Sequence, residues 1–442
     1  MALTRERRRT ILILALPIIG GMISQNVLNL VDTAMVGALG NEALGAVGFG
    51  GFANFIAIAF ITGLATGVQA MVARRHGEER HDESAVPLNG GLMLSLLIGL
   101  PVSLLFAALA PTVFPLITSD AEVGRLAGDY LQIRVLSAVF IGANFAFRGY
   151  WNGVSRSGVY FRTIVVMHAL NILLNWLLIH GNLGMPALGV RGAALGTAIA
   201  NAVGCMLYAV QAFVLARDGG FLRALPDRAT LATMLRLAGP AGLQSFFFAG
   251  GMFCFFWIVE QMGTAEVAAT NVLVNLFLVF ILPGMAFGLA SASLVGQSLG
   301  RGNAGEARGW ALDVATLGGA TMGSLALLGA LVPDALLTPF LHDPEVVALA
   351  RWPLRILLLG IVVDTVGSVM MNSLLGAGDA RTVMAVAVTM QWFVFLPVAF
   401  LVGPVLGLGL VSVWIAQSVY RLIQTTIFVT IWRRGRWSRI RV

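Results

Sequence analysis

The sequence predicts an all-α protein that crosses a membrane many times, and three observations support this prediction. Hydrophobic residues make up 58% of the 442 residues, whereas charged residues make up only 11%. A water-soluble domain carries about 25% charged residues, so this chain could not cover itself with a polar surface. The apolar residues fall into runs long enough to span a bilayer, which takes about 20 residues per helix. Twelve such runs fill most of the chain and exclude a sizeable soluble domain such as an ATPase.

The twelve predicted spans form two sets of six, joined by short loops. The first run is too long for a cleaved signal peptide and lacks a small-residue cleavage site, so we interpret it as a span. The first set covers residues 11–37, 44–73, 86–110, 126–149, 158–180 and 190–216, and the second covers 234–260, 265–298, 309–332, 350–375, 382–402 and 406–432.

The arginines predict the orientation of these spans. All 28 basic residues are arginines, and most gather at the two termini and in every second connection. The remaining connections hold mainly acidic residues. Because cytoplasmic loops carry an excess of basic residues, both termini should be cytoplasmic. The positive net charge then reflects membrane topology, and we expect no nucleic acid partner.

An internal repeat divides the chain into halves. When the chain is shifted by 223 residues, residues 14–17 (LALP) fall on residues 237–240 (LAGP), and Gly153 falls on Gly376. Six spans return the chain to its starting side, so the halves should be parallel, with a substrate path between them. The predicted division is an N-terminal lobe over residues 1–216, a cytoplasmic linker over 217–233 and a C-terminal lobe over 234–442.

Two carboxylates lie inside predicted spans, where an ionisable group marks a candidate functional site. Asp32 lies in the first span, nearer its outer end, and Asp364 lies near the middle of the tenth. Each costs about 2.5–3.5 kcal/mol at a helix centre on the lenient insertion scale. Neither acid has a counterpart in the other half, which favours a role specific to one lobe, although a neighbouring helix could also satisfy each carboxylate. Polar residues at helical spacing extend both positions into a possible substrate path: Gln25, Asn29, Asp364, Ser368 and Asn372.

Further polar side chains are expected beside Asp32. His168, Asn171 and Asn175 follow one face of the fifth span. The fifth span runs outward and the sixth inward, so Asn175 and Thr197 should lie at the depth of Asp32. Asn and Thr often serve only as hydrogen-bonding contacts between membrane helices, but a shared depth with an acid favours a cation-coupling group of Asp32, Asn171, Asn175 and Thr197. His168 lies deeper and is more typical of a packing residue.

Enzymatic chemistry finds no support in the sequence. The chain contains no H-E-x-x-H, G-x-S-x-G or C-x-x-C motif, and its five histidines are not grouped at metal-ligand spacing. Both cysteines, Cys205 and Cys254, fall within apolar runs, so no disulfide framework is expected. We therefore expect no enzyme, no catalytic residues, no cofactor and no metal.

Several short motifs, spread over essentially the whole chain, resemble one transporter family. Pro17 is followed fifteen residues later by Asp32 within Val-Asp-Thr, and the other motifs are residues 35–37 (MVG), 130–134 (YLQIR), 171–175 (NILLN) and 192–197 (GAALGT). The chain thereby resembles the multidrug and toxic compound extrusion (MATE) transporters, specifically their DinF-like branch.

The resemblance implies two six-helix bundles in a V-shaped, alternating-access exporter. It implies that Asp32 is the cation-coupling carboxylate, with Asn171, Asn175 and Thr197 around it. It also implies that the first span, kinked at Pro17, bends with the protonation state of Asp32.

Two departures from the family pattern bear on the coupling. Relatives often have Asp at the position of Asn175, and the NorM-like branch has a Glu in span 7 where this chain has Phe248. Asp364 does match the span 10 acid of that branch. The second lobe therefore has one of the two acids found there and lacks the other.

Together these features predict a monomeric secondary active antiporter in the plasma (inner) membrane. It should export cationic or amphipathic drugs and other toxic compounds across the lipid bilayer in exchange for inward flow of protons or, less readily, sodium ions. A sodium site needs several hard oxygen ligands, whereas a lone acid among neutral donors suits a proton.

The alternative is a flippase for lipids or lipid-linked saccharides from the same superfamily. Such flippases often line their central cavity with basic residues. Few of the 28 arginines lie inside a predicted span, which disfavours this alternative.

Overall fold

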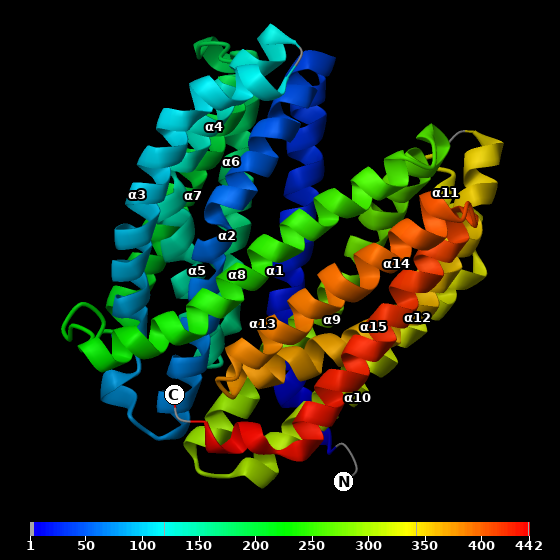
Figure 1. Cartoon of the computed structure of the whole chain (residues 1–442). Coiled ribbons are helices and arrows are strands. Elements are labelled where there is room, and N and C mark those ends of the chain that lie inside the picture. Colours follow the sequence, from blue (N-terminus) through cyan, green and yellow to red (C-terminus); the bar gives the residue numbers. More distant parts are fainter. Residues whose placement is uncertain (1–3, 119, 342, 441) are drawn as a thin grey trace. The chain divides into compact units, whose positions relative to one another are not determined.

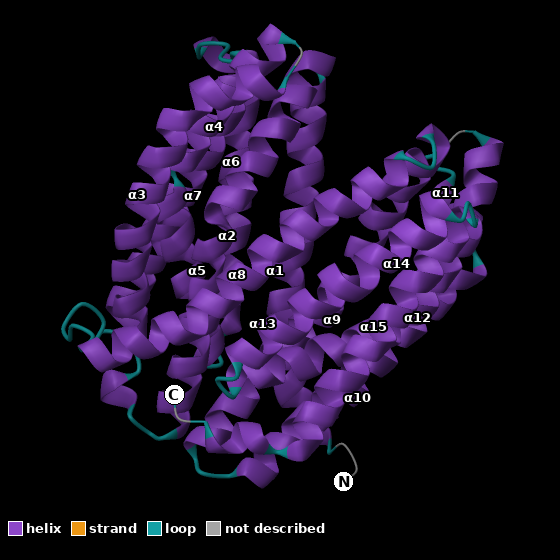
Figure 2. Cartoon of the chain, viewed as in Figure 1, coloured by secondary structure: helices purple, strands orange, loops and turns teal. Residues whose placement is uncertain are grey.

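The computed structural model describes residues 4–118, 120–341, 343–440 and 442, and every regular element among them is helical (Figures 1 and 2). The helices are α1 (Arg5–Gly37), α2 (Asn41–Gly77), α3 (Val86–Ile117), α4 (Ala121–Leu136), α5 (Ala138–Gly153), α6 (Ser157–His180), α7 (Val190–Leu215), α8 (Arg228–Glu260), α9 (Thr264–Gly300), α10 (Ala304–Leu331), α11 (Pro333–Leu337), α12 (Pro344–Gly376), α13 (Ala380–Thr389), α14 (Leu396–Phe400) and α15 (Gly409–Arg434).

The predicted all-α membrane fold is confirmed by the length and composition of these helices. Ten helical segments in the described part of the chain are long and apolar enough to cross a membrane, and the bent pair α4–α5 makes eleven. One of the ten is Ala380–Val405, in which π-helical turns join α13 and α14. The twelfth predicted span corresponds to α15. Its 26 residues extend about 39 Å at 1.5 Å per residue, which is long enough to cross a membrane, but the helix has a charged residue, Arg421, near its middle.

The internal repeat is visible in the helix boundaries. The helices α1, α2 and α6 begin at residues 5, 41 and 157, and α8, α9 and α13 begin at residues 228, 264 and 380, which is 223 residues later in each case. The pair α4–α5 covers residues 121–153, and α12 covers 344–376 at the same offset. The two copies differ in one respect, because the first bends by 48° between α4 and α5 whereas α12 is continuous.

Hydrogen bonds from serine side chains support the bend between α4 and α5. Ser137 interrupts the helix, and its hydroxyl donates to the carbonyl of Arg134 at 2.7 Å. Ser103 of α3 donates to the carbonyl of Val135, also at 2.7 Å. The Arg134 carbonyl also accepts from the backbone N–H of Ser137 at 3.1 Å, so the serine hydroxyls add side-chain donors to the carbonyls at the break.

Glycines at equivalent positions bring helices close together in both copies of the repeat. A Cβ atom at Gly153 of α5 would lie 2.8 Å from Val72 of α2, and one at Gly376 of α12 would collide with the carbonyl oxygen of Ala292 in α9. Small residues of this kind permit close helix packing in membranes. The match of Gly153 with Gly376 in the sequence therefore corresponds to a shared packing contact.

The chain forms two compact units, and two helices are divided between them. One unit consists of Met1–Ile19 with Phe246–Val442, and the other of Gly20–Ser245. The division therefore falls inside α1 and α8 and not at the predicted linker. The division into six-helix lobes over residues 1–216 and 234–442 stays a prediction.

The connection between α7 and α8 is held firmly at the start of α3. The amide nitrogen of Asn89 donates to the carbonyls of Gly220 and Ala224, both at 2.8 Å. Its amide oxygen accepts from the backbone N–H of Leu222 at 3.1 Å. Because α8 already begins at Arg228, only the first part of the predicted linker 217–233 is non-helical.

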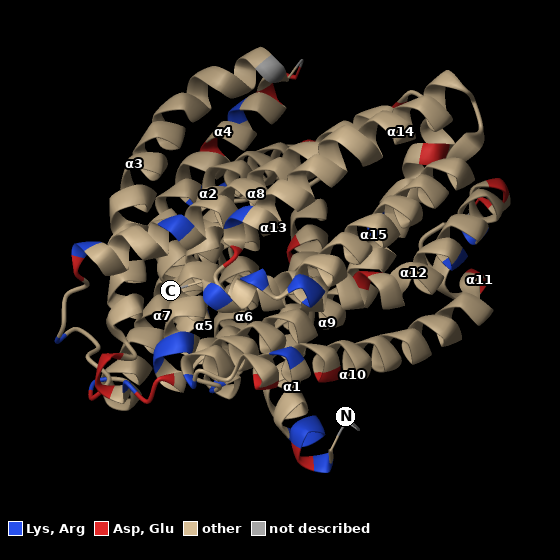
Figure 3. Ribbon diagram, turned by 60° about the horizontal axis from the view of Figure 1, so that its bottom comes forward, with Lys and Arg blue, Asp and Glu red and all other residues tan. Residues whose placement is uncertain are grey.

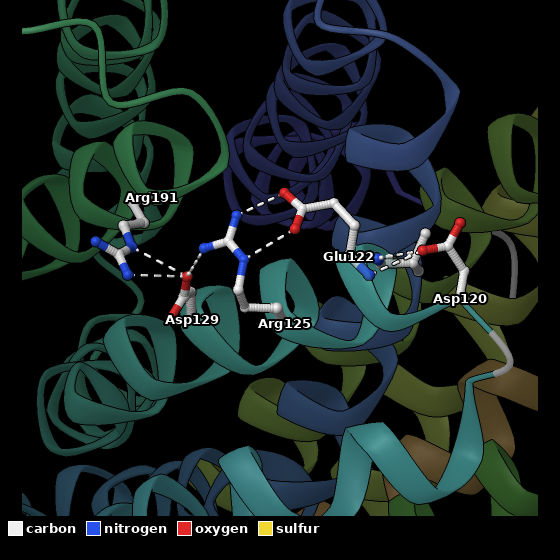
Figure 4. A network of polar contacts seen from close by, with 6 residues as sticks. Asp120, Glu122, Arg125, Asp129 and Arg191 are labelled. Atoms are coloured by element: carbon white, nitrogen blue, oxygen red, sulfur yellow. Dashed lines mark hydrogen bonds and ion pairs between the residues drawn. The ribbon is translucent and has the colours of Figure 1, made fainter.

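Charged residues gather toward helix ends, while most helix middles are uncharged (Figure 3). One group at the start of α4 forms a network of ion pairs (Figure 4). Arg125 pairs with Glu122 at 2.5 Å and with Asp129 at 3.2 Å, and Arg191 at the start of α7 reaches Asp129 at 3.0 Å. These contacts join two helices of the unit that also holds Asp32.

Candidate functional site

Asp32 of α1 lies beside two asparagines of α6. The amide nitrogen of Asn175 donates to Asp32 Oδ1 at 2.8 Å. Asn171 and Asn175 are 1% and 0% exposed, whereas Asp32 is half-buried. One side of the carboxylate therefore contacts buried polar side chains, and the other side remains partly exposed.

Asn171 links Asp32 to α7. When its amide nitrogen faces Asp32 Oδ1, at 3.2 Å, its oxygen accepts from the hydroxyl of Thr197 at 3.0 Å and from the Thr197 backbone N–H at 3.3 Å. This orientation gives both ends of the Asn171 amide a partner, whereas in the opposite orientation the Asn171 oxygen accepts from the Asn175 amide nitrogen at 3.1 Å. The structure thus brings together all four residues predicted for cation coupling: Asp32, Asn171, Asn175 and Thr197.

Gly196 of α7 makes room for the Asn175 side chain. A Cβ atom at this position would collide with Asn175 Oδ1. That oxygen is buried and has no hydrogen-bond partner in the described part of the chain. Asn175 thus presents its donor nitrogen to Asp32 and keeps a free acceptor on the other side of the amide.

A second polar chain lies along α1 and contains His168. The hydroxyl of Ser24 contacts His168 Nδ1 at 2.7 Å, and His168 Nε2 lies 3.1 Å from Gln25 Oε1. Gln25 in turn donates to Asn29 at 3.1 Å. The Gln25 oxygen can only accept, so Nε2 carries the hydrogen and donates to it; in a neutral imidazole Nδ1 then accepts from the Ser24 hydroxyl. This arrangement agrees with the predicted packing role of His168.

Pro17 lies at a position suited to bending of α1. Proline has no N–H group to donate to the carbonyl of Ile13, which weakens the helix locally. The division of α1 between the two compact units falls between Ile19 and Gly20, two residues beyond Pro17. The first part of α1 also borders a cavity of about 530 Å³, which is lined by residues from Arg5 to Pro17.

Asp364 of α12 faces an arginine that the sequence analysis did not single out. Its Oδ1 lies 3.5 Å from Nε of Arg421 in α15. The other polar residues on this face of α12 do not extend the pair: Asn372 donates to the carbonyl of Ser368 at 2.9 Å. The expected stripe therefore separates into an Asp364–Arg421 ion pair and a local Asn372–Ser368 contact.

Comparison with known proteins identifies the family. A model of the MatE family matches residues 17–177 and 240–401. The chain belongs to the MatE family. The two matches begin 223 residues apart (240 − 17 = 223), so the family model follows the internal repeat.

Similar MatE-family proteins extend over nearly the whole chain. The "probable multidrug resistance protein NorM" of Thermotoga maritima is 24% identical and covers 98% of this chain and 94% of its own length. A protein of the same description from Agrobacterium fabrum is 28% identical, covering 96% and 94%. Because these relatives are transporters, the prediction that the chain is not an enzyme is confirmed.

Solved MATE structures share the fold. One described as MATE in the straight conformation superposes with a TM-score of 0.89 at 21% identity, covering 97% of this chain and 96% of that one. A MOP superfamily transporter from Pyrococcus furiosus also superposes with a TM-score of 0.89 at 21% identity, covering 98% and 97%. The predicted MATE fold is thereby confirmed.

Two arginines inside the helices of this MatE-family chain were missed by sequence reasoning. Arg421 pairs with Asp364, and Arg134 lies in α4, within the unit that holds Asp32. Two nitrogens of Arg134 are buried without a hydrogen-bond partner in the described residues, and its guanidinium lies 5.8 Å from the ring centre of Tyr130. The free-energy cost of placing an arginine inside a membrane is similar to that of an acid. This cost could have marked Arg134 and Arg421 as candidate functional residues from the sequence.

Proposed function

We propose that this MatE-family protein is a secondary active antiporter that exports cationic or amphipathic compounds, driven by the inward flow of protons. Asp32 is the coupling carboxylate in this proposal. The observation that carries it is the contact of Asp32 with Asn175, together with the neighbouring Asn171 and Thr197. The multidrug resistance relatives support drug-like compounds as the substrate class.

The donors around Asp32 favour a proton over a sodium ion. Asn171 and Asn175 direct amide nitrogens at the same carboxylate oxygen. A sodium ion at that oxygen would meet N–H groups where it needs oxygen ligands. An ionised carboxylate accepts hydrogen bonds from both amides, whereas a protonated one carries no charge and holds them less strongly.

This change in hydrogen bonding supplies a link between protonation and helix shape. Loss of charge on Asp32 weakens its attachment to α6, so α1 is free to bend at Pro17. Protonation from the outside and release to the inside then alternate with outward release of substrate. The arginine distribution supports cytoplasmic termini in the plasma (inner) membrane.

The test is dye uptake into inverted vesicles, energised separately by a proton gradient and by a sodium gradient. The proposal expects uptake with the proton gradient alone and its loss in Asp32→Asn. Uptake that follows a sodium gradient at clamped pH would overturn proton coupling.

Arg134 supports a second candidate function, the export of lipids or lipid-linked saccharides. Its buried, unpaired nitrogens could receive a phosphate group. Transfer of a fluorescent phospholipid between the leaflets of proteoliposomes, lost in Arg134→Gln, would favour this candidate over drug export.

A further inference from the structure

The Asp364–Arg421 pair borders a cavity of about 250 Å³ between α12 and α15. The polar part of its lining comes from Asp364, Arg421, Ser418 and Gln417. The rest of the lining is mainly aliphatic. The cavity thus combines one acid, one base and apolar walls within a single unit.

The geometry of the ion pair is loose for a buried pair. Asp364 Oδ1 and Arg421 Nε lie 3.5 Å apart, and both atoms are buried without a hydrogen bond in the described residues. The Asp364 side chain is 7% exposed and that of Arg421 is 24% exposed. Another nitrogen of Arg421 makes only a long contact, 3.4 Å, with Gln424. A purely structural Arg–carboxylate pair is frequently bidentate, with nitrogen–oxygen distances of about 2.7–2.9 Å.

Both buried charges therefore retain unused hydrogen-bonding capacity beside an open space. A ligand group that satisfies both must offer a donor to Asp364 and an acceptor to Arg421, and a group that also neutralises both charges carries one positive and one negative charge. Since Asp364 and Arg421 are adjacent, the two ligand charges must be adjacent too, as in an α-amino acid, where one carbon separates the ammonium from the carboxylate.

We propose that this cavity is a subsite for compounds with an α-amino-acid head group and an apolar body. The ammonium group pairs with Asp364, the carboxylate pairs with Arg421, and the apolar body contacts the aliphatic walls. This inference rests on the proposed export function and names zwitterions as a further substrate class.

The direct test measures binding of three matched probes to the purified full chain. Phenylalanine carries both charges, its methyl ester only the positive one, and N-acetylphenylalanine only the negative one. Arg421→Gln should weaken phenylalanine binding at least about tenfold, as expected for loss of a charged hydrogen bond, and should leave the ester unaffected. Asp364→Asn should weaken phenylalanine and its ester but spare N-acetylphenylalanine.

Two further variants separate binding in the cavity from damage to the fold. A Cβ atom at Gly360, which also lines the cavity, would lie 3.8 Å from Ser418 Oγ, so Gly360→Ala is sterically tolerated. Gly360→Leu should fill the space and abolish binding of phenylalanine while both charges remain. Arg351 pairs with Asp334 at 2.7 Å outside the cavity, so Arg351→Gln is a matched control that should bind phenylalanine normally.

Folding is checked by the thermal transition of each variant, and the double variant Asp364→Asn/Arg421→Gln avoids an unpaired buried charge. It should fold and fail to bind phenylalanine. The subsite proposal is overturned if phenylalanine does not bind the folded wild type, which is the result expected when water alone fills the cavity. It is also overturned if Arg421→Gln weakens the binding of phenylalanine and of its ester equally. Asp32→Asn should still bind phenylalanine. The binding test of this cavity can therefore be interpreted even if the antiport proposal fails.

Discussion

Asn175 directs the nitrogen of its amide, and not the oxygen, at the carboxylate of Asp32, at a distance of 2.8 Å. The amide oxygen points toward Gly196, where the absence of a side chain leaves space for it. The site thus combines one acid with neutral hydrogen-bond donors. This polarity is the basis of the proton coupling proposed above and leads to the first two predictions.

Asp32→Asn should abolish coupled efflux without loss of expression. The substitution keeps the size of the side chain but removes the group that gains and loses a proton. Dye uptake into inverted vesicles under a proton gradient checks this, with Glu42→Gln at the exposed start of α2 as control. Wild-type efflux from Asp32→Asn would disprove the coupling role.

Asn175→Asp should introduce sodium dependence. A second carboxylate beside Asp32 replaces an N–H donor by oxygen ligands, which a hard cation prefers. Efflux driven by a sodium gradient at clamped pH should become measurable in this variant. Asn175→Ala is the control, because it removes the donor without adding a ligand, and equal sodium responses in both variants would contradict the explanation.

Pro17→Ala should reduce the transport rate severalfold while expression stays normal. Alanine restores the N–H donor and stiffens α1 near Ile19, where the helix passes from one compact unit to the other. Initial rates of efflux provide the measurement. Pro101→Ala, inside α3, is the matched control and should transport at the wild-type rate.

Asp364→Asn should reduce efflux of singly charged cations only partially. Arg421 lies 3.5 Å from Asp364 and offsets part of its charge, so Asp364 should hold such cations less strongly than a carboxylate without a neighbouring arginine. The comparison of initial rates for a quaternary ammonium dye between Asp364→Asn and Asp32→Asn tests the difference. Complete loss of efflux in Asp364→Asn, at normal expression, would show that Asp364 is as important for transport as Asp32.

Asn89→Ala should destabilise the protein by about 1–3 kcal/mol, because it leaves backbone groups of the 220–224 segment without their buried partner. A lower temperature of unfolding in detergent is the expected result. Asn182→Ala removes a single hydrogen bond at an exposed position and serves as the control. Equal unfolding temperatures for the two variants would show that the segment is held by other contacts.

Composition and periodicity were sufficient to predict the fold class, because a bilayer leaves few ways to satisfy backbone polar groups. The repeat was equally readable, since packing glycines such as Gly153 and Gly376 had kept their positions. Asp32, Asn171, Asn175 and Thr197 could be grouped because helix direction and depth follow from the order of the spans.

The pairing of Asp364 with Arg421 could not be predicted in the same way. It depends on which faces of α12 and α15 meet, and helix depth alone does not determine that. The bend at Ser137 was also missed, because serine is common in membrane helices and only the donors from neighbouring side chains make a break favourable.

The division of α1 between two units has a consequence for biosynthesis. Arg7 forms an ion pair with Asp313 and lies 4.2 Å from the ring centre of Trp310, so its partners are translated some 300 residues after it. At about 5–20 residues per second, the ribosome needs roughly 15–60 s to reach Asp313. During that interval the start of the nascent chain has no α10 to bind, so the arginines at the start of α1 need water or lipid head groups as partners until α10 is made.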